Sequence, residues 1–295
     1  MEKILTENEN KLQTAFCEVV ESMYRIHDID MEKSESLFPE SPFGFLYSKK
    51  NNLAIHCINT NYKNWQTLSP FLFSDMCDEA AKRKIKLIHL WYDVWANNNE
   101  LVQKRLLAQA GISKKIFARN TDVVELNKKD ATTFFETNHL QKNANANFHY
   151  GLMHRNEIVA AISFSKARKM TYEKELFQSY ELIRFASIAG YTVTGGLSKL
   201  LQHFIKTQKA KHIMTYADRD WSDGLSYRKL GFRFIENLKP QSFIIDRIGL
   251  KRMFIDENKL STINGYAKRL PPWKPENTLI KVYNSGSAKY ILDLR

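Results

Sequence analysis

The chain contains few of the residues that mark small disulfide-bonded proteins or membrane proteins. Its three cysteines, Cys17, Cys57 and Cys77, are odd in number, widely spaced and form no CxxC pair. This pattern argues against a disulfide framework and a cysteine zinc site, and it fits a reducing compartment. The sequence has no uninterrupted apolar run of about 18 residues, and its first ten residues lack the basic and apolar segments of a signal peptide. We therefore expect a cytoplasmic protein that does not use a membrane.

Apolar residues are abundant enough to build real cores. Of the 295 residues, 43% are hydrophobic and 12% are aromatic. This composition excludes intrinsically disordered and low-complexity classes, and we find no internal repeat. A length of this size favours two domains over one.

Positive charge is in excess and is distributed unevenly. The formal net charge is +12, with −6 in residues 1–40, +7 in residues 41–120 and +11 in residues 121–295. An excess of this sign fits a surface that faces nucleic acid, but it also fits a lysine-rich protein kept in solution by self-repulsion. Charge alone leaves both interpretations open.

Hydrophobic periodicity predicts an α/β arrangement in the first part of the chain. An amphipathic helix over 9–26 is followed by a connector over 31–45. Strands over 53–58 and 85–91, separated by a helix over 71–84, indicate a parallel α/β unit. A further helix over 98–110 ends at Gly111, a typical C-terminal stop.

The later part of the chain predicts a second domain, with a boundary near residue 120. It begins with a helix over 129–138 and a hairpin over 148–165, and a charged loop follows over 166–178. The remaining elements are expected as strands over 180–186, 211–218, 232–235 and 242–245, with a helix over 199–207. We expect an N-terminal helix and connector (1–44), two domains (45–120 and 121–246) and a basic C-terminal extension (247–295).

A glycine-containing turn before the helix at 199–207 is the strongest local pattern. Its residues are Thr194, Gly195, Gly196, Leu197 and Ser198. Glycines allow a ligand to approach the backbone, and the free N–H groups at a helix start favour a phosphate or another anion. Ordinary turn chemistry explains the same pattern without a ligand.

A second pattern lies at the end of the predicted strand over 211–218. Acidic and aromatic residues gather there, and ligand sites in open α/β sheets lie at such strand ends. Asp218 is a candidate base or amine-orienting group, and Tyr227 is a candidate proton donor. Alternatively, Asp218 caps the next helix in a purely structural turn.

The sequence gives no sign of a metal centre. The histidines at 139, 149, 154, 203 and 212 have no metal-ligand spacing. Metal-dependent cleavage of nucleic acid needs carboxylates that hold Mg²⁺. The strand over 53–58 supplies none, and only Asp93 and Glu100 lie beyond the next strand. His56 and Lys63 are possible phosphate contacts, although a histidine in a strand is usually structural.

Several segments resemble one group of known proteins. Residues 82–95 and 115–119 resemble the N-terminal module of phage Hef-type homing-endonuclease-like proteins, which is similar to a very-short-patch-repair (Vsr) endonuclease. The resemblance continues in residues 138–141, 180–185, 195–200, 216–221, 227–232 and 281–287. It implies a restriction-endonuclease-like fold in the first domain. Where those relatives carry acidic residues after the apolar strand and then an aromatic–histidine pair, this chain has His56, Ile58 and Tyr62–Lys63. Where they have an acidic residue after Ile-His-Leu-Trp, it has Tyr92, so the comparison implies that cleavage has been lost.

Residues 122–245 are similar to the GNAT acyltransferase superfamily and, within it, to Mom-type DNA adenine-modification proteins. On that resemblance Arg184, Ser198, Asp218 and Tyr227 take the positions of functional residues, and the turn at 194–198 would bind the phosphates of acetyl-CoA or another acyl-CoA. The usual GNAT pyrophosphate pattern is not intact in 191–198.

Three hypotheses follow from the sequence, the third of which is a GNAT-shaped fold without catalysis. The first is a GNAT-like N-acyltransferase, with a mixed-sheet domain behind a degenerate nuclease-like domain, that acts on or near DNA. The second is a homing-endonuclease-like protein that binds or cuts DNA.

Overall fold

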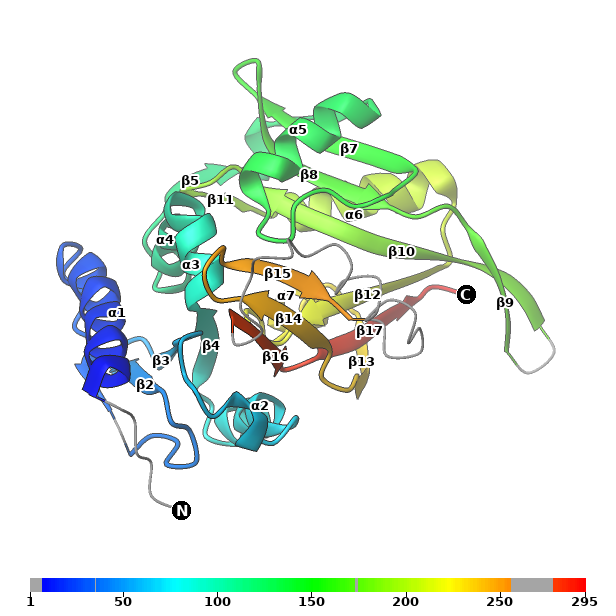
Figure 1. Cartoon of the computed structure of the whole chain (residues 1–295). Helices are drawn as coiled ribbons and strands as arrows, with labels where there is room; N and C mark the ends of the chain where they lie inside the picture. Colours follow the sequence, from blue (N-terminus) through cyan, green and yellow to red (C-terminus); the bar gives the residue numbers. More distant parts are fainter. Residues whose placement is uncertain (1–6, 35, 173–174, 256–277) are drawn as a thin grey trace. The chain divides into compact units, whose positions relative to one another are not determined.

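This computed structural model describes residues 7–34, 36–172, 175–255 and 278–295. The chain forms two compact units, both shown in Figure 1. Unit 1 comprises the chain up to Asn99, Asp218–Asp223 and Leu238–Ser287, whereas unit 2 comprises Glu100–Ala217, Gly224–Asn237 and Ala288–Arg295. The boundaries expected at 120 and 246 therefore do not separate the units, because the chain passes between them five times.

Unit 1 is built on a mixed sheet with the strand order β1-β2-β3-β4. These strands are β1 (Glu32–Lys33), β2 (Gly44–Ser48), β3 (Leu53–Ile58) and β4 (Lys86–Trp91). The β3–β4 pair is parallel and α2 (Leu72–Lys82) connects it, which confirms the predicted α/β unit. The helices α1 (Glu7–Arg25) and α3 (Tyr92–Asn97) and the short η1 (Trp65–Thr67) also belong to unit 1.

A second sheet in unit 1 corrects the expectation of a C-terminal extension. Its order is β15-β14-β16, formed by β14 (Ser242–Asp246), β15 (Lys251–Phe254) and β16 (Leu279–Tyr283). Alternating apolar residues on these strands pack into the core of unit 1, where Ile245, Ile280 and Val282 are buried beside aromatic residues such as Trp91. The proline-rich stretch at 270–275 lies outside the described residues.

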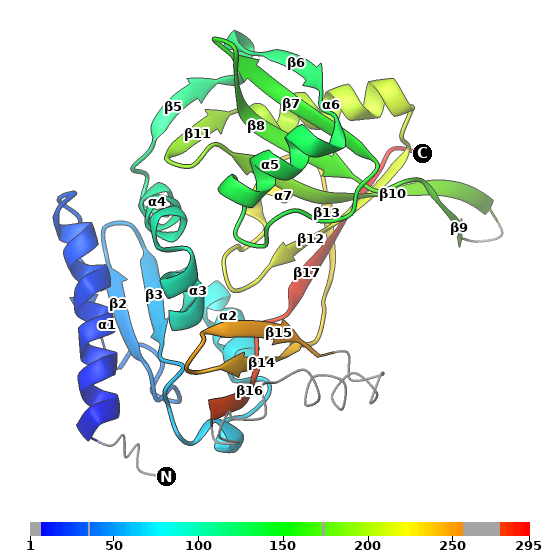
Figure 2. The same cartoon turned by 45° about the horizontal axis from the view of Figure 1, so that its top comes forward.

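Unit 2 contains a larger sheet with the order β13-β17-β12-β10-β8-β7-β6, and β9 adds to β10. Figure 2 shows this sheet from a second direction. Its strands are β6 (Asp122–Glu125), β7 (Phe148–His154), β8 (Glu157–Phe164), β9 (Arg168–Tyr172), β10 (Glu175–Ser187), β12 (His212–Asp218), β13 (Arg233–Asn237) and β17 (Ser287–Asp293). The segment expected as a charged loop over 166–178 is instead largely a hairpin of β9 and β10, and β17 lies inside the sheet rather than in an appendage.

Helices cover both faces of the unit 2 sheet. On one face, Leu200, Leu201 and Phe204 of α6 (Gly196–Gln208) pack on alternate residues of β8, and the Phe204 ring stacks on Phe164 at 3.6 Å. On the other face, Phe134 and Phe135 of α5 (Lys128–Asn138) pack against residues that include Ala161. Because successive side chains of β8 point to opposite faces of the sheet, this one strand contributes apolar residues to the cores on both faces.

The remaining elements of unit 2 are short. They are α4 (Asn99–Gln109), η2 (Ala118–Asn120), α7 (Leu225–Arg228) and the parallel pair β5 (Lys114–Phe117) and β11 (Tyr191–Thr194). The described helices include none that combines the length and the apolar character needed to span a membrane. The fold is mixed α/β, as the sequence predicted.

Candidate functional site

The two parallel central strands of unit 2 are paired over only part of their length. Tyr180–Leu182 of β10 pair with Ile213–Thr215 of β12, although β10 continues to Ser187 and β12 to Asp218. Among the described residues, the carboxyl halves of these strands are thus outside the parallel pairing. Ligand sites in open α/β sheets lie at the carboxyl ends of parallel strands, so this is the favoured place for a site.

Arg184 lies on the part of β10 that pairs with β8 but not with β12. A register shift between Leu182 and Arg184 interrupts the pairing with β8. Such bulges change the direction of a side chain and are common beside functional sites. The Arg184 guanidinium donates hydrogen bonds to the carbonyl oxygens of Lys142 at 3.2 Å and of Ile183 at 2.9 Å. These bonds hold the positive charge of Arg184 beside the carboxyl half of β10.

Tyr227, near the end of α7, belongs to the same group of side chains. Burial raises the pKa of its phenol, and this effect outweighs a hydrogen bond with Thr215 and the charges of Arg105 and Arg184, which lower the pKa. Thr215 is itself buried and donates to the carbonyl oxygen of Leu182 at 3.0 Å. The phenol therefore keeps its proton at neutral pH and remains a proton donor.

His139 lies in the same positive field. Burial first, and then the charges of Arg105 and Arg184, lower the pKa of His139 to about 3. The imidazole is neutral in every ordinary buffer, so it adds no charge to the group. The sequence analysis did not single out Arg105, because α4 gave only an amphipathic pattern, and it considered His139 only as a possible metal ligand.

The predicted turn forms the start of α6. Gly195 is the N-cap residue, with φ 79°, and no side chain caps the helix. This left-handed conformation costs a glycine little, whereas other residues pay about 1 kcal/mol for it. Thr194 and Gly195 are exposed, and a Cβ at Gly196 would approach Val193 Cγ1 to 3.0 Å. The first amides of α6 can thus receive an anion at close range.

Lys199 fixes this turn within unit 2. Its ammonium group donates hydrogen bonds to the carbonyl oxygens of Ala118, at 2.9 Å, and of Thr121. Those residues belong to and follow η2, which the β5–β11 pair places beside the turn. Lys199 is a positioning residue that the sequence analysis did not single out, because its partners are about 80 residues earlier in the chain.

Asp218 falls in unit 1, whereas Arg184, Ser198 and Tyr227 belong to unit 2. Its Oδ1 accepts a hydrogen bond from the Asp220 backbone N–H at 3.0 Å, and its carbonyl oxygen accepts from Trp221 and Ser222. Asp218 therefore lies in a hydrogen-bonded turn, but it does not cap the next helix, because Gly224 is the N-cap residue of α7 and no side chain caps that helix. The structure brings Arg184 and Tyr227 into one electrostatic group, and the N-terminal turn of α6 carries Ser198.

The neighbouring charged residues Arg219 and Asp220 stabilise unit 1. Asp220 is 5% exposed and accepts hydrogen bonds from Trp91 Nε1 at 3.0 Å, from Ser285 N at 2.9 Å and from Ser285 Oγ at 2.6 Å. Arg219 bonds to Asp78 at 2.6 Å and to the carbonyl oxygens of Ser74 and Ser285. The cluster of acidic residues at 218–223 thus has a structural use within unit 1.

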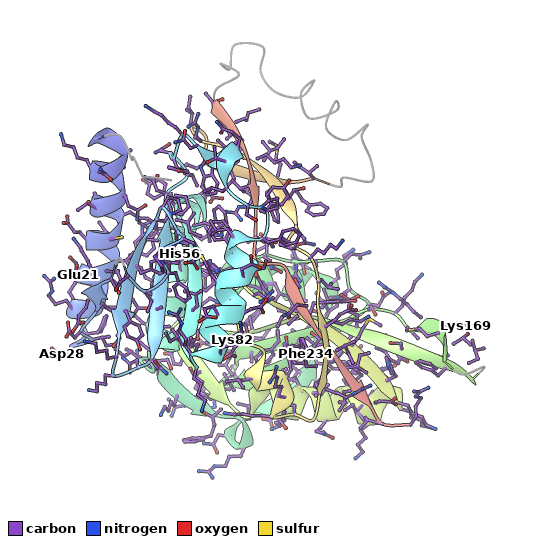
Figure 3. All side chains as sticks on the ribbon, turned by 90° about the horizontal axis from the view of Figure 1, so that it is seen from below. Glu21, Asp28, His56, Lys82, Lys169 and Phe234 are labelled. Carbon is purple, nitrogen blue, oxygen red and sulfur yellow. The ribbon has the colours of Figure 1, made fainter. Side chains whose placement is uncertain are left out.

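His56 is in the interior of unit 1 and does not contact solvent (Figure 3). Its Nδ1 lies 2.9 Å from His89 Nδ1 and its Nε2 lies 2.7 Å from Ser41 Oγ. Burial lowers the pKa of His89 to about 4 and raises that of the nearby Cys77 thiol to about 12. His56 is therefore a buried structural histidine and not an accessible phosphate contact, which corrects that possibility.

Asp93, the carboxylate considered for Mg²⁺, and Lys63, a possible phosphate contact, also belong to unit 1. Asp93 is buried, and Arg252 of β15 donates two hydrogen bonds of 2.9 Å to its carboxylate. Lys63 is exposed. Within the described ranges, no group of three histidine, cysteine or acidic side chains could hold a metal ion.

No protein-family model matches the chain, and no curated protein matches it. Solved structures similar to it include a Bacillus subtilis acetyltransferase in complex with CoA, at 16% identity and TM-score 0.35, covering 60% of this chain and 99% of the other. A GNAT family acetyltransferase from Elizabethkingia anophelis with acetyl-CoA bound shows 13% identity and TM-score 0.32, covering 59% and 99%. An IAA acetyltransferase from Bacillus cereus shows 13% identity and TM-score 0.33, with the same coverage. At these low values, the function has to be argued from the residues of this chain.

Proposed function

We propose that unit 2 is a GNAT-like N-acyltransferase that uses acetyl-CoA or another acyl-CoA. The observation that carries this proposal is the start of α6, where the exposed Gly195 is the N-cap residue and no side chain caps the first amides, close in sequence to the strand that bears Arg184. A bound acyl-CoA would supply the acyl group that is transferred to an amine. Its phosphates would be held by the amides of Gly196, Leu197 and Ser198.

In this proposal, Tyr227 and Arg184 serve the acyl transfer. The raised pKa of Tyr227 keeps a proton on its phenol oxygen, which it can donate to a leaving group. Arg184 is held by two carbonyl oxygens and would orient the reacting groups without itself giving up a proton. Asp218 is proposed as the group that receives the amine proton, on the family resemblance alone.

We further propose that the acceptor amine lies on or near nucleic acid, as Mom-type base modification would require. The net charge of +12 supports an anionic partner. Unit 1 would then be a nuclease-derived scaffold that serves DNA binding.

Calorimetric titration with acetyl-CoA tests the donor site. Ser198→Asp adds negative charge at the start of α6, where the helix dipole favours it, so the variant should fold while binding is lost. Ser198→Asn is the matched neutral control and should bind acetyl-CoA like the unaltered protein. Equal binding by both variants, or no saturable binding by the unaltered protein at millimolar ligand, would reject the donor site.

The transfer step is tested separately once an acceptor amine is found. Tyr227→Phe should reduce the transfer rate by roughly 100-fold or more while acetyl-CoA still binds. Asp218→Asn should reduce the rate as well, and Tyr191→Phe serves as a control on β11. An unchanged rate in Tyr227→Phe or Asp218→Asn would remove that residue from the proposal.

Cleavage of DNA by unit 1 is the alternative, and the ion pair between Asp93 and Arg252 disfavours it. A carboxylate that accepts two hydrogen bonds from a guanidinium has little capacity left to ligate Mg²⁺. We expect no nicking of plasmid DNA by the purified protein with Mg²⁺. Nicking that Asp93→Asn abolishes would establish the alternative instead.

A further inference from the structure

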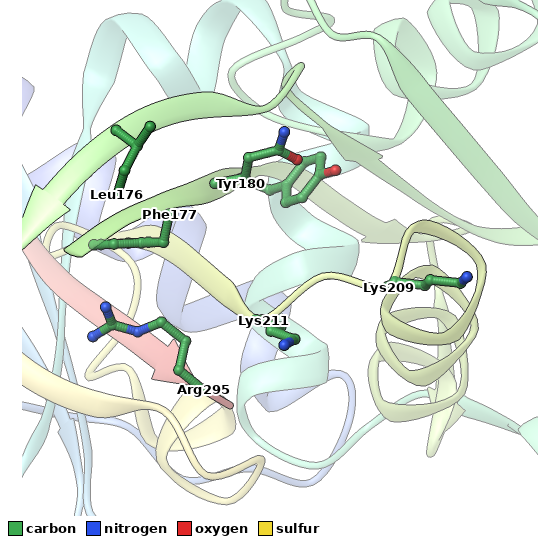
Figure 4. Close-up of a pocket in the computed structure, with 7 residues that line it drawn as sticks. Leu176, Phe177, Tyr180, Lys209, Lys211 and Arg295 are labelled. Atoms are coloured by element: carbon green, nitrogen blue, oxygen red, sulfur yellow. The ribbon is translucent and has the colours of Figure 1, made fainter.

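Unit 2 has a shallow hollow of about 530 Å³ near the amino-terminal ends of β10 and β12. Its lining includes Phe177 and Tyr180 of β10, Lys209 and Lys211 between α6 and β12, and Arg295 (Figure 4). The candidate acyl-CoA site is at the opposite, carboxyl ends of the same strands. The hollow is therefore a separate feature of unit 2.

The cations of the hollow are of two kinds. The Arg295 guanidinium lies 4.0 Å from the centre of the Phe177 ring and is paired with Asp293 at 2.7 Å, which lowers the pKa of that carboxyl to about 2. Lys209 and Lys211 are exposed, and no described carboxylate forms an ion pair with either. The hollow thus carries two positive charges beyond the Arg295–Asp293 pair.

The hairpin of β9 and β10 brings further cations, Arg168 and Lys169, to the same end of unit 2, and the paired residues of its two strands contain one acidic residue, Glu175. Its described strands pair from Arg168–Ser179 to Tyr172–Glu175, and both views show it extending from the sheet (Figures 1 and 2). Lys166 and Lys169 are exposed and have no ion pair with a described carboxylate, whereas Arg168 pairs with Glu181 at 3.5 Å. Hydrophobic side chains are also exposed there, with Leu176 at 67%.

We propose that this hairpin enters the major groove of duplex DNA while Lys209 and Lys211 contact the phosphates beside it. Five residue pairs span about 16 Å, and a major groove about 12 Å wide admits a two-stranded ribbon. Phosphate contacts from exposed lysines fix the position of such a ribbon. This inference deepens the nucleic-acid part of the proposed function and is independent of acyl transfer.

Fluorescence anisotropy with a labelled 30-base-pair duplex, at several salt concentrations, tests the site. The first variant is Lys209→Asn with Lys211→Gln, because asparagine tolerates the φ of 49° at residue 209. Loss of two phosphate contacts should weaken binding roughly 10- to 100-fold near 0.1 M salt and reduce the log–log salt slope by about two. The hairpin variant, Lys166→Gln with Lys169→Gln, should also weaken binding.

A matched control removes the same charge elsewhere in unit 2. Lys128→Gln with Lys129→Gln, in the exposed first turn of α5, should leave the salt slope nearly unchanged. Equal losses in all three double variants would mean that only net charge matters, and they would overturn the site. Absent duplex binding, or tighter binding to a single-stranded 30-mer, would overturn the groove assignment. Titration of the same preparations with acetyl-CoA separates these outcomes from failure of the acyl-CoA proposal.

Discussion

The two units use their buried polar residues in different ways. In unit 1, His56, His89, Asp220 and Asp93 form hydrogen bonds to one another or to nearby donors inside the unit. In unit 2, apolar packing covers both faces of the sheet, and His149 and His212 form hydrogen bonds to buried serines. Arg184, Tyr227 and His139, however, form an electrostatic group, and Arg184 lies on the part of β10 that β12 does not pair with. Buried polar residues that satisfy each other stabilise a fold, whereas polar residues at the carboxyl ends of parallel strands are placed to meet a ligand.

The largest expected effect comes from breaking the network of unit 1. Asp220→Ala leaves the N–H of Trp91 and the two donors of Ser285 without their acceptor, so the free energy of unfolding should fall by about 3–5 kcal/mol. The tryptophans that the structure describes, Trp65, Trp91, Trp95 and Trp221, fall within unit 1, so tryptophan fluorescence during urea denaturation reports this unit. The exposed Asp30→Ala is the control, with a change below about 0.5 kcal/mol. Similar results for the two variants would mean that the hydrogen bonds of Asp220 do not stabilise unit 1.

Acid should destabilise unit 1 through His89. The pKa of His89 is lowered from 6.5 to about 4 in the folded protein, so the unfolded chain binds more protons between these values. Stability is therefore retained above about pH 6.5 and falls by about 3 kcal/mol as the pH drops to about 4. Urea denaturation followed by tryptophan fluorescence at a series of pH values measures this slope. The exposed His27→Gln should keep the slope and His89→Gln should reduce it, whereas a flat profile would mean that protonation of His89 is not coupled to unfolding.

A smaller effect is expected in unit 2 from Lys199. Lys199→Met removes two charge-assisted hydrogen bonds to backbone carbonyl oxygens, which should cost about 1–3 kcal/mol. Thermal unfolding followed by circular dichroism measures the loss, and Lys206→Met on the exposed part of α6 is the control. If both variants unfold alike, Lys199 does not hold the turn.

The smallest effect is expected at the surface of unit 1. Lys49 lies 3.2 Å from Glu32, but their side chains are 74% and 56% exposed. Solvent and salt screen such a pair, so Lys49→Gln should change the free energy of unfolding by less than about 0.5 kcal/mol. A loss above 1 kcal/mol in urea denaturation would show that exposed pairs also stabilise this unit.

The local sequence pattern was sufficient to predict the strands that have strong hydrophobic periodicity and clear turn residues at their ends. The predicted ranges of β3, β4, β7 and β8 agree with the structure within about one residue, because apolar runs and turn residues delimit them. The hairpin of β9 and β10 was missed, because its charged, exposed strands have no core pattern. β16 and β17 were taken for an extension, because their partners in the sheets are distant in the sequence.

The candidate site was predictable only in part. Gly195 and Gly196 identified the start of α6, and their spacing from a strand is a local signal. The partners of Asp220 are 65 and 129 residues away in the chain, so no local pattern could show that its carboxylate is used inside unit 1. The register shift near Arg184 and the end of pairing between β10 and β12 are tertiary features as well.

The position of β17 has a consequence for how the protein is made. This strand, Ser287–Asp293, lies between β13 and β12, both of which are synthesised much earlier. On a ribosome, the sheet of unit 2 cannot close until the chain has been made through Asp293, so β12 and β13 must wait with exposed edges. A nascent chain stalled before residue 287 should therefore need protection by chaperones, and removal of the last strand should leave unit 2 unable to complete its sheet.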